Sequence, residues 1–311
     1  MAWLGIDLGG TNTSLGLVGE DGLWETRRLA TRAAEGPEAW LDRLAPLARE
    51  LGEAAARRGS PLAGVGLASP GSLDREAGRV VFSPNLPSFN GYPLGSELSA
   101  ALDLPVALEN DANLYALGER TFGAGQSRDD LACLTLGTGV GAGIILGGHL
   151  VVGPLGSGGE LGHMVVEPAG RTCGCGVAGC LEAYASATGL KGMLAEALQQ
   201  GRETTLGPGD DPHQMHQAAQ AGDALARELW ARAGRALGRA VAALVVTCGL
   251  DLVIIGGGLA AAWPDFLAPA AREELARRLR IVEPERVKLV PGVLGDQAPL
   301  LGAAGLAAHG R

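Results

Sequence analysis

Residues 3–18 read WLGIDLGGTNTSLGLV, in which two apolar runs flank a glycine-rich turn. We interpret the runs at 3–7 and 13–18 as strands joined by a turn of the hairpin type, followed by a third strand over 23–30. The same order returns at residues 131–146, which read LACLTLGTGVGAGIIL. These two strand–turn–strand segments are interpreted as distant copies of one supersecondary unit.

Strands and helices alternate through the rest of the chain. Helices are expected over about 37–57, 112–122, 188–200, 223–248, 265–280 and 297–308. Strands are expected over 64–69, 105–109, 252–255 and 287–290, and the proline-rich residues 72–97 are expected to be irregular. This mixture in two similar halves predicts an α/β protein of two lobes. We expect a smaller first lobe over 1–118, closed by a C-terminal helix at 297–311, and a larger second lobe over 119–296.

Composition excludes several classes of protein. The 311 residues carry a net charge of −9, and 47% of them are hydrophobic against 19% charged, which is typical of a compact soluble chain. Basic residues form no dense cluster, so a nucleic-acid partner is not expected. Residues 241–262, the most apolar segment, are interrupted by Asp251 and three glycines and do not resemble a membrane span. The first seven residues lack the features of a secretory leader, so we expect a cytoplasmic location.

The first glycine turn has the features of a phosphate site. Asp7 ends a strand just before Gly9, Gly10 and Thr11, where glycines let backbone N–H groups approach a phosphate and Thr11 adds a hydroxyl donor. The Asp7 carboxylate would then face Mg²⁺. An ordinary hairpin turn with Asp as a turn-forming residue is the alternative. Neither of the two lysines precedes Ser or Thr, which excludes a Walker A loop, so backbone amides must bind any phosphate.

Two further glycine turns lie in the second half. Residues 136–141 form a second glycine-rich turn between two expected strands, like the first, with Thr138 and Gly139 in the turn. A dinucleotide-binding motif needs a helix after its glycines, and residues 144–146 predict a strand instead, so we reject that interpretation. Gly256–Gly258 stands between a strand and a helix, where it could hold the nucleoside end of ATP. A tight strand-to-helix turn is the alternative.

A polar group marks another strand-to-helix junction, at residues 109–113, which read ENDAN. The functional interpretation makes Asp111 a general base that takes a proton from an alcohol as it attacks a γ-phosphate, and Asn110 a hydroxyl-binding residue. The alternative is that these residues only cap the helix, since Asp is a favoured N-cap.

One histidine and three of the five cysteines predict a metal site. His163, Cys173, Cys175 and Cys180 lie within eighteen residues and match a closed, tetrahedral and therefore structural Zn²⁺ site. In a reducing compartment such a cluster suggests metal before disulfides.

Two acidic residues flank these ligands. Glu160 and Glu182 would be held in place by the metal loop, which makes them candidate acceptors for sugar hydroxyls. The alternative for each is a solvent-facing acid.

Taken together, these motifs resemble the ROK family of repressors and sugar kinases. The resemblance covers nearly the whole chain and rests on residues 7–11, 109–113, 136–141, 159–163 and 173–182. It implies an actin-like ATPase (ribonuclease H-like) fold, with two lobes and with ATP and sugar in a central cleft. It also implies that Asp111 is the base for the sugar's 6-hydroxyl and that the chain forms homodimers or homotetramers.

The resemblance also implies which residues line each ligand. Residues toward the sugar are Gly71, Asn85, Asn110, Asp111, Glu160, His163 and Glu182, with His163 also a zinc ligand. Residues toward ATP and Mg²⁺ are Asp7, Gly9, Gly10, Thr11, Asn12, Thr138, Gly139, Gly256, Gly257 and Gly258. The zinc loop and the nucleotide site are expected in the second lobe.

This sequence departs from the family pattern in two places. The family often has Lys where this chain has Asn12, so a positive charge near the phosphates is lost. Family repressors carry a DNA-binding domain before the first strand, and only six residues precede Asp7 here, so we expect none.

The expected activity is ATP-dependent phosphorylation of a hexose at its 6-hydroxyl, glucose before others. Mannose, fructose, N-acetylglucosamine and N-acetylmannosamine stay open as substrates, and polyphosphate stays open as a donor. A non-catalytic sugar sensor would not need Asp111, and a zinc-stabilised structural protein would leave Asp7, Asp111 and the glycine turns unexplained. We expect hexose selectivity to depend on the loops around 71–92 and 155–160.

Overall fold

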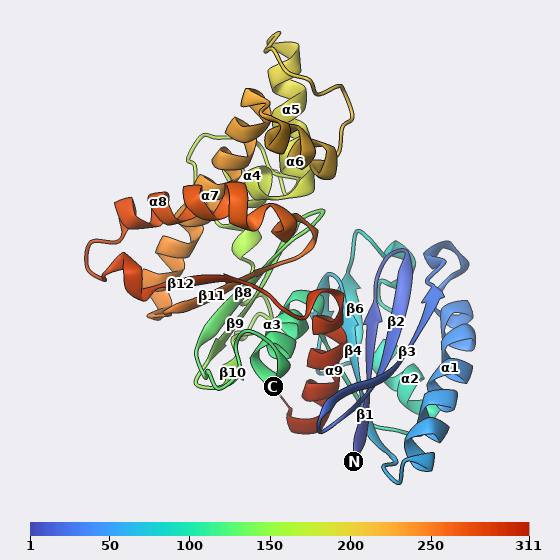
Figure 1. Ribbon diagram of the computed structural model, residues 1–311. Helices are drawn as coiled ribbons and strands as arrows, with labels where there is room; N and C mark the ends of the chain where they lie inside the picture. Colours follow the sequence, from blue (N-terminus) through green and yellow to red (C-terminus); the bar gives the residue numbers. More distant parts are fainter. Residues whose placement is uncertain (311) are drawn as a thin grey trace. The chain divides into compact units, whose positions relative to one another are not determined.

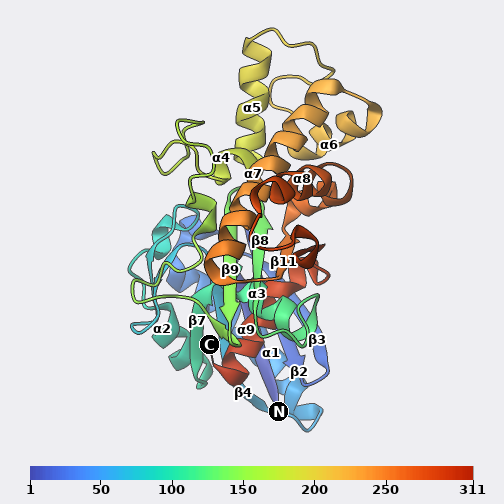
Figure 2. The same cartoon turned by 90° about the vertical axis from the view of Figure 1, so that its left-hand side faces the viewer.

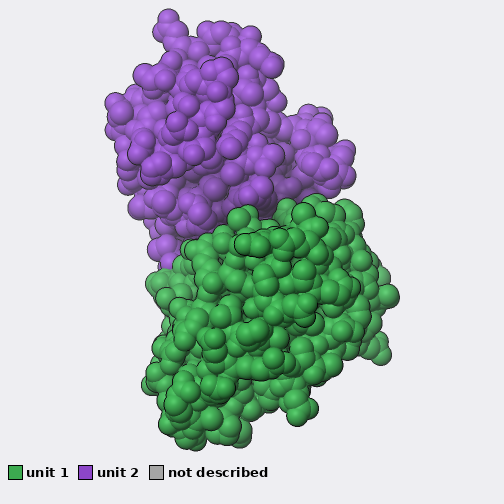
Figure 3. All heavy atoms as spheres, turned by 90° about the vertical axis from the view of Figure 1, so that its right-hand side faces the viewer, with its two compact units in different colours: residues 1–129, 143–159, 293–311 green, residues 130–142, 160–292 purple. Residues whose placement is uncertain are grey.

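The computed structural model describes residues 1–310 and divides the chain into two compact units. Figure 3 colours the two units separately. Unit 1 contains residues 1–129 and 143–159 and the chain from Val293 onward, and unit 2 contains Asp130–Ala142 and Glu160–Gly292. Arg311, the last residue of the expected C-terminal helix, lies outside the described residues.

Unit 1 is built on a five-stranded mixed sheet with the strand order β3-β2-β1-β4-β7 (Figure 1). β1 pairs antiparallel with β2 and parallel with β4, and β4 pairs parallel with β7. The strands are β1 (Ala2–Leu8), β2 (Asn12–Gly19), β3 (Gly22–Ala30), β4 (Leu62–Ser69) and β7 (Val106–Asn110). The helices of this unit are α1 (Pro37–Arg57), α2 (Leu94–Leu102), α3 (Asp111–Phe122) and α9 (Ala298–His309).

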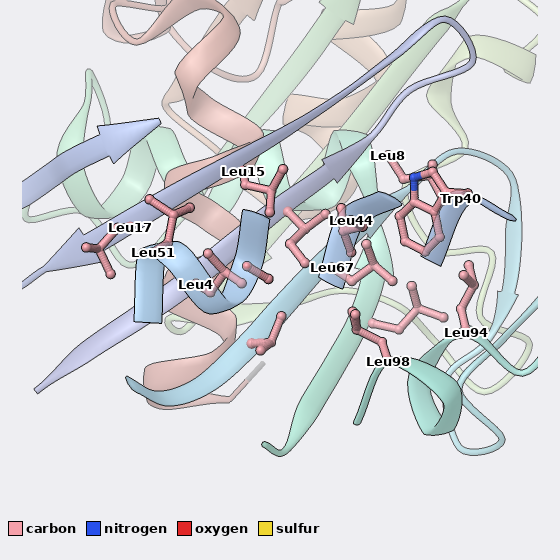
Figure 4. Packing of buried hydrophobic residues seen from close by; sticks show 14 of the residues in the cluster. Leu4, Leu8, Leu15, Leu17, Trp40, Leu44, Leu51, Leu67, Leu94 and Leu98 are labelled. Atoms are coloured by element: carbon pink, nitrogen blue, oxygen red, sulfur yellow. The ribbon is translucent and has the colours of Figure 1, made fainter. Parts of the chain in front are cut away.

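The core of unit 1 follows from the alternation of residues along β1. Leu4, Ile6 and Leu8 are fully buried on one side of the sheet, in a cluster with side chains of α1 such as Trp40 and Leu44 (Figure 4). Complete burial of each such side chain contributes about 1.5–3 kcal/mol.

The other side of β1 and β4 is covered by α9. Gly5 and Gly66 have no side chain, and a Cβ at either position would overlap the backbone of α9 at Leu300 or Ala303. The two glycines therefore let the helix lie directly on the sheet.

Residues 72–97 are more regular than expected. They contain a small antiparallel hairpin of β5 (Ser72–Asp74) and β6 (Arg79–Phe82), a short 3₁₀ turn at Pro87–Phe89, and the start of α2. The expectation of an irregular segment was wrong here because the prolines lie at element boundaries. Pro93, for example, is the N-cap of α2.

Unit 2 holds most of a second five-stranded sheet, of order β10-β9-β8-β11-β12. β11 pairs parallel with both β8 and β12. Strand β9 passes into unit 1 after Ala142, and β10 belongs to unit 1. The strands are β8 (Leu131–Leu136), β9 (Val140–Leu146), β10 (His149–Leu150), β11 (Leu252–Gly256) and β12 (Lys288–Pro291).

The helices of unit 2 are α4 (Glu182–Ala185), α5 (Ala187–Gln199), α6 (Pro212–Ala221), α7 (Ala224–Cys248) and α8 (Ala268–Arg278). The long helix α7 packs along α8 (Figure 2). It begins where Asp223 accepts a hydrogen bond from the Ala226 N–H group and ends at Gly249, which has a left-handed conformation. These caps are the boundaries that the sequence predicts.

Most predicted elements agree with the structure to within a few residues, but the lobe boundary at 118/119 does not coincide with the units. Helix α3 continues through that boundary to Phe122 and packs against α9, so both belong to unit 1. Residues 143–159 also belong to unit 1. Within residues 1–310, no helix combines the length and the apolar character that crossing a lipid bilayer would need.

Candidate active site

The first glycine turn joins β1 to β2 in unit 1. The Gly9 N–H group donates to the Asn12 carbonyl oxygen at 3.1 Å, and the Thr31 hydroxyl donates to the Gly9 carbonyl oxygen at 2.6 Å. The turn is therefore held by Thr31, the residue after β3, while Gly10 and Thr11 at its tip are exposed. This arrangement suits a loop that meets a ligand with its backbone.

Asp7, at the end of β1, lies among other carboxylates of unit 1. The pKa of Asp7 is raised to about 7, first by burial and then by the negative charges of Asp111 and Asp296. A divalent cation with oxygen ligands would relieve this repulsion, so the residues fit Mg²⁺. Sequence analysis missed Asp296, although a polar residue just before the apolar helix α9 is the same signal that identified Asp111.

At the start of α3, the residue that caps the helix is different from the proposed base. Asn110 is the N-cap, because its side-chain oxygen accepts from the N–H groups of Ala112 at 3.0 Å and Asn113 at 3.4 Å. Asp111 is the first residue of the helix and accepts from the Ala112 N–H group at 2.9 Å. The helix therefore does not need Asp111 as its cap, and the carboxylate stands at the positive end of the helix dipole.

The expected sugar residues of unit 1 lie around this junction. The Asn110 side-chain amide donates to the Gly71 carbonyl oxygen at 3.3 Å. Asn85 is exposed and lies against the first glycine turn, since a Cβ at Gly10 would be 3.3 Å from the Asn85 carbonyl oxygen. Unit 1 thus brings Asp7, Gly71, Asn85, Asn110 and Asp111 to one end of its sheet.

A buried ion pair stands directly behind Asn110. Glu109 is fully buried and accepts from Arg75 through Nε at 2.7 Å and Nη2 at 2.5 Å. Burial alone would raise the pKa of Glu109, but hydrogen bonds from Arg75, the Asn110 N–H group and Asn113 hold that pKa below its usual value. Sequence analysis gave Arg75 no role, and nothing in its local sequence indicates a partner 34 residues away.

The second glycine turn joins β8 to β9 and is anchored within unit 2. The Gly137 N–H group donates to the Gly139 carbonyl oxygen at 3.0 Å, and the Ala187 N–H group donates to the Gly137 carbonyl oxygen at 2.8 Å. The third turn, Gly256–Gly258, lies beside it, because a Cβ at Gly257 would be 2.5 Å from the Leu136 carbonyl oxygen. Unit 2 therefore brings its two predicted nucleotide turns together.

The predicted metal ligands also come together in unit 2. One ligand atom each from His163, Cys173, Cys175 and Cys180 lies within 4.8 Å of the other three. Cys173 Sγ is 3.8 Å from His163 Nδ1, and Cys175 Sγ is 3.7 Å from Cys180 Sγ. In a tetrahedral site with metal–ligand distances of about 2.0–2.3 Å, ligand atoms lie about 3.5–3.8 Å apart.

The chemistry of these four donors also favours a metal ion. All three cysteines are free thiols at separations far beyond a disulfide bond. Burial raises the pKa of the Cys173 thiol to about 12, so a cation is needed to hold it as a thiolate at neutral pH. The donor set therefore fits a bound metal ion.

Glu182 joins the metal cluster to the second glycine turn. Its Oε1 accepts from the Cys173 thiol at 3.5 Å, and its Oε2 accepts from the Val140 N–H group at 3.0 Å. Glu160 is exposed at the start of the short 3₁₀ turn Leu161–His163. The two carboxylates thus differ: Glu182 is fixed by the protein, and Glu160 faces solvent.

Comparison with known proteins identifies the group to which this architecture belongs. The model of the ROK family matches residues 3–309. The chain belongs to the ROK family. It is 39% identical over 310 residues to a glucokinase of Thermotoga maritima, an alignment that covers 97% of this chain and 96% of the relative.

Two solved ROK structures are similar throughout. The ROK hexokinase of Thermus thermophilus is 36% identical with a TM-score of 0.84, over 98% of this chain and 97% of that chain. The ROK family glucokinase of Streptomyces griseus, solved in complex with glucose and AMPPNP, is 33% identical with a TM-score of 0.77, over the full length of both. The expected two-lobed α/β fold of the actin-like ATPase type is confirmed.

Proposed function

We propose that this protein is an ATP-dependent sugar kinase that phosphorylates the 6-hydroxyl of a hexose, with glucose as the preferred substrate. The observation that carries the proposal is the placement of Asp111, which begins α3 beside its cap Asn110 and within the electrostatic reach of Asp7. The glucokinase relative and the glucokinase complex with glucose and AMPPNP support the choice of substrates.

In this proposal Asp111 is the general base. Its carboxylate takes the proton of the 6-hydroxyl as that oxygen attacks the γ-phosphate. Asn110 is held by its capping bonds and by Gly71, so its amide is pre-positioned for a sugar hydroxyl. Asn85, Gly71, Glu160, His163 and Glu182 are proposed as further sugar contacts.

The glycine turns are proposed to hold ATP. Gly9, Gly10, Thr11 and Asn12 are proposed to meet its phosphates, and Thr138, Gly139 and Gly256–Gly258 are proposed to hold the nucleotide. Asp7 would face Mg²⁺, which when bound neutralises charge on the phosphates. The raised pKa of Asp7 supports this, because a bound cation would stabilise its carboxylate against the burial and the nearby negative charges that raise the pKa.

The metal of His163, Cys173, Cys175 and Cys180 is proposed to be zinc, because three thiolates and one imidazole are a common structural zinc set. Four protein ligands leave no open position, so the metal would fix the loop and take no part in phosphoryl transfer. Elemental analysis of protein purified without chelator should find one zinc per chain.

Two properties of the whole molecule belong to the proposal. The clustered cysteines, which fit a metal site rather than disulfides, support the proposal of a reducing, cytoplasmic location. A homodimer or homotetramer is proposed from the family resemblance, and light scattering after size-exclusion chromatography measures it.

A coupled assay on a panel of sugars tests the function. Glucose, mannose, fructose, N-acetylglucosamine and N-acetylmannosamine are each offered with Mg²⁺ and either ATP or polyphosphate. We expect the highest kcat/KM for glucose with ATP. Glucose binding by calorimetry without phosphorylation of any sugar would instead identify a sensor and refute the kinase.

A further inference from the structure

Arg75 links its own hairpin to two other segments of unit 1. It lies in the turn between β5 and β6, four residues after Gly71 in the chain. Two of its nitrogens bind the Glu109 carboxylate at 2.7 and 2.5 Å, and Nη1 donates to the Gly156 carbonyl oxygen at 3.0 Å. One guanidinium thus joins the β5–β6 hairpin, the loop around Gly156 and the end of β7.

The contacts of Glu109 extend this network to the proposed base. Its Oε1 also accepts from the Asn110 N–H group at 2.8 Å and from Asn113 Nδ2 at 3.0 Å. Glu109 therefore fixes the residue that caps α3 and, through it, the start of the helix where Asp111 stands. The Arg75 side chain is 11% exposed and that of Glu109 is 0% exposed, so both charges are largely removed from water.

The loop around Gly156 is shaped to meet Arg75. Gly156 has a φ of +69°, and a Cβ there would lie 2.8 Å from Arg75 Nη1. Four residues later the chain reaches Glu160, a proposed sugar contact. The hairpin likewise follows Gly71 and precedes Asn85, two other proposed contacts.

A buried ion pair is weak evidence for stability, because the loss of hydration offsets the attraction of the charges. Its better-attested use is to specify one geometry, and a planar guanidinium in a two-bonded fork does so with direction as well as charge. The three segments that Arg75 joins are those that carry sugar contacts and the base.

We propose that Arg75, through Glu109 and Gly156, is a positioning residue that sets hexose selectivity by fixing the two sugar-facing loops relative to the base. This inference rests on the proposed function. Without the fork, the loops around 71–92 and 155–160 would adopt several positions and would accept epimers of the preferred sugar more equally. A displacement of about 1 Å in such a site can cost on the order of 10²-fold in rate.

Arg75→Lys is the main test, since it keeps the charge and loses the fork. We expect kcat/KM for the preferred hexose to fall on the order of 10-fold. The ratio of kcat/KM for the preferred hexose to kcat/KM for its 2- and 4-epimers should fall as well. KM for ATP should change less than about twofold. Arg79→Lys is the matched control, because Arg79 lies in the same hairpin, is exposed, and pairs at the surface with Asp74 at 3.2 Å. It should leave the selectivity ratio unchanged.

Two further measurements separate this inference from the proposed function. The ratio of Kd values for the epimers is measured by calorimetry without nucleotide, so selectivity is readable even if the chain transfers no phosphate. Hydrogen exchange should become faster at residues 153–158 in Arg75→Lys and not in Arg79→Lys. Gly156→Ala disturbs the same contact from the loop side and should lower selectivity in the same way. An unchanged selectivity ratio in folded Arg75→Lys would overturn the proposal.

Discussion

The two strand–turn–strand segments use one backbone design in different electrostatic surroundings. The first runs Asp7-Leu8-Gly9 and the second Thr135-Leu136-Gly137, so a carboxylate in one unit stands where a neutral hydroxyl stands in the other. Asp7 lies near Asp111 and Asp296, whereas the second turn has one carboxylate, Glu182, that accepts from its Val140 N–H group. We propose from this difference that the first turn handles a cation, through Asp7, as well as phosphates, whereas the second turn has no carboxylate at the matching position, Thr135.

The strongest test of the acidic first region is Asp111→Asn. We expect kcat to fall on the order of 10²–10⁴-fold, because the general base is lost while the helix keeps its cap Asn110. Glucose affinity, measured by calorimetry, should change little. A variant that kept more than a tenth of the wild-type kcat at saturating sugar would show that Asp111 is not the base.

The second region is tested by removing the metal with Cys175→Ser. Cys175 is exposed, so the change opens no cavity in the core. Glu182 contacts both Cys173 and the Val140 N–H group, so it connects the metal site to the second glycine turn. Loss of a side chain that contacts a metal ligand in this way typically lowers metal affinity or activity by about 10–100-fold. We therefore expect weaker sugar and nucleotide binding together, measured by titration with glucose and with AMPPNP. Cys248→Ser is the control. An unchanged AMPPNP affinity in the metal-free variant would show that the metal site does not influence the second glycine turn.

Asp7→Asn makes the first turn neutral like the second and should stabilise the protein when Mg²⁺ and nucleotide are absent. The folded-state pKa of Asp7, about 7, lies above the 3.8 that is usual for an aspartate, so its ionisation destabilises the fold. This penalty is fully present above pH 7, at most about 4 kcal/mol, and is lost as the pH falls toward 4.

Thermal unfolding at several pH values measures this effect. The melting temperature of Asp7→Asn should exceed that of the wild type at pH 7.5 and approach it near pH 4. Asp21→Asn, at an exposed position, should show no such dependence. A constant difference across the pH range would mean that the charge of Asp7 is not the cause.

The smallest expected effect comes from Asn12→Lys, which returns the charge that the family often carries at the first turn. Asn12 is partly buried at the start of β2, where a long side chain can reach along the turn. Nucleotide affinity should rise by about two- to fivefold at low salt, and less at high salt. Asn12→Gln serves as the neutral control, and weaker binding in the Lys variant at low salt would contradict the assignment.

Sequence reasoning succeeded where the signal is local. The strands around both glycine turns follow from short apolar runs, and α7 from the cap Asp223 and the terminal Gly249. It also predicted that His163, Cys173, Cys175 and Cys180 would lie together, because they are close in the chain, and the structure brings these four side chains together. It failed on β5, β6 and the start of α2, which are too short for a periodic pattern to emerge between prolines.

Contacts between residues far apart in the chain could not be predicted from the sequence. Arg75 and Glu109 are 34 residues apart, and neither charge by itself indicates burial. Asp296 reaches the region of Asp7 only because α9 lies on β1. Helix α6 was overlooked, although the capping box of Asp211 and Gln214, with Pro212 at the first helical position, could have indicated its start.

The position of α9 has a consequence for biosynthesis. This helix covers β1 and β4, and Leu301 and Ala304 pack with Val18 from the start of the chain. A ribosome must therefore complete the whole of Glu160–Gly292 before the segment that covers the first sheet emerges. Until then, the nascent first sheet exposes an apolar face to chaperones and proteases.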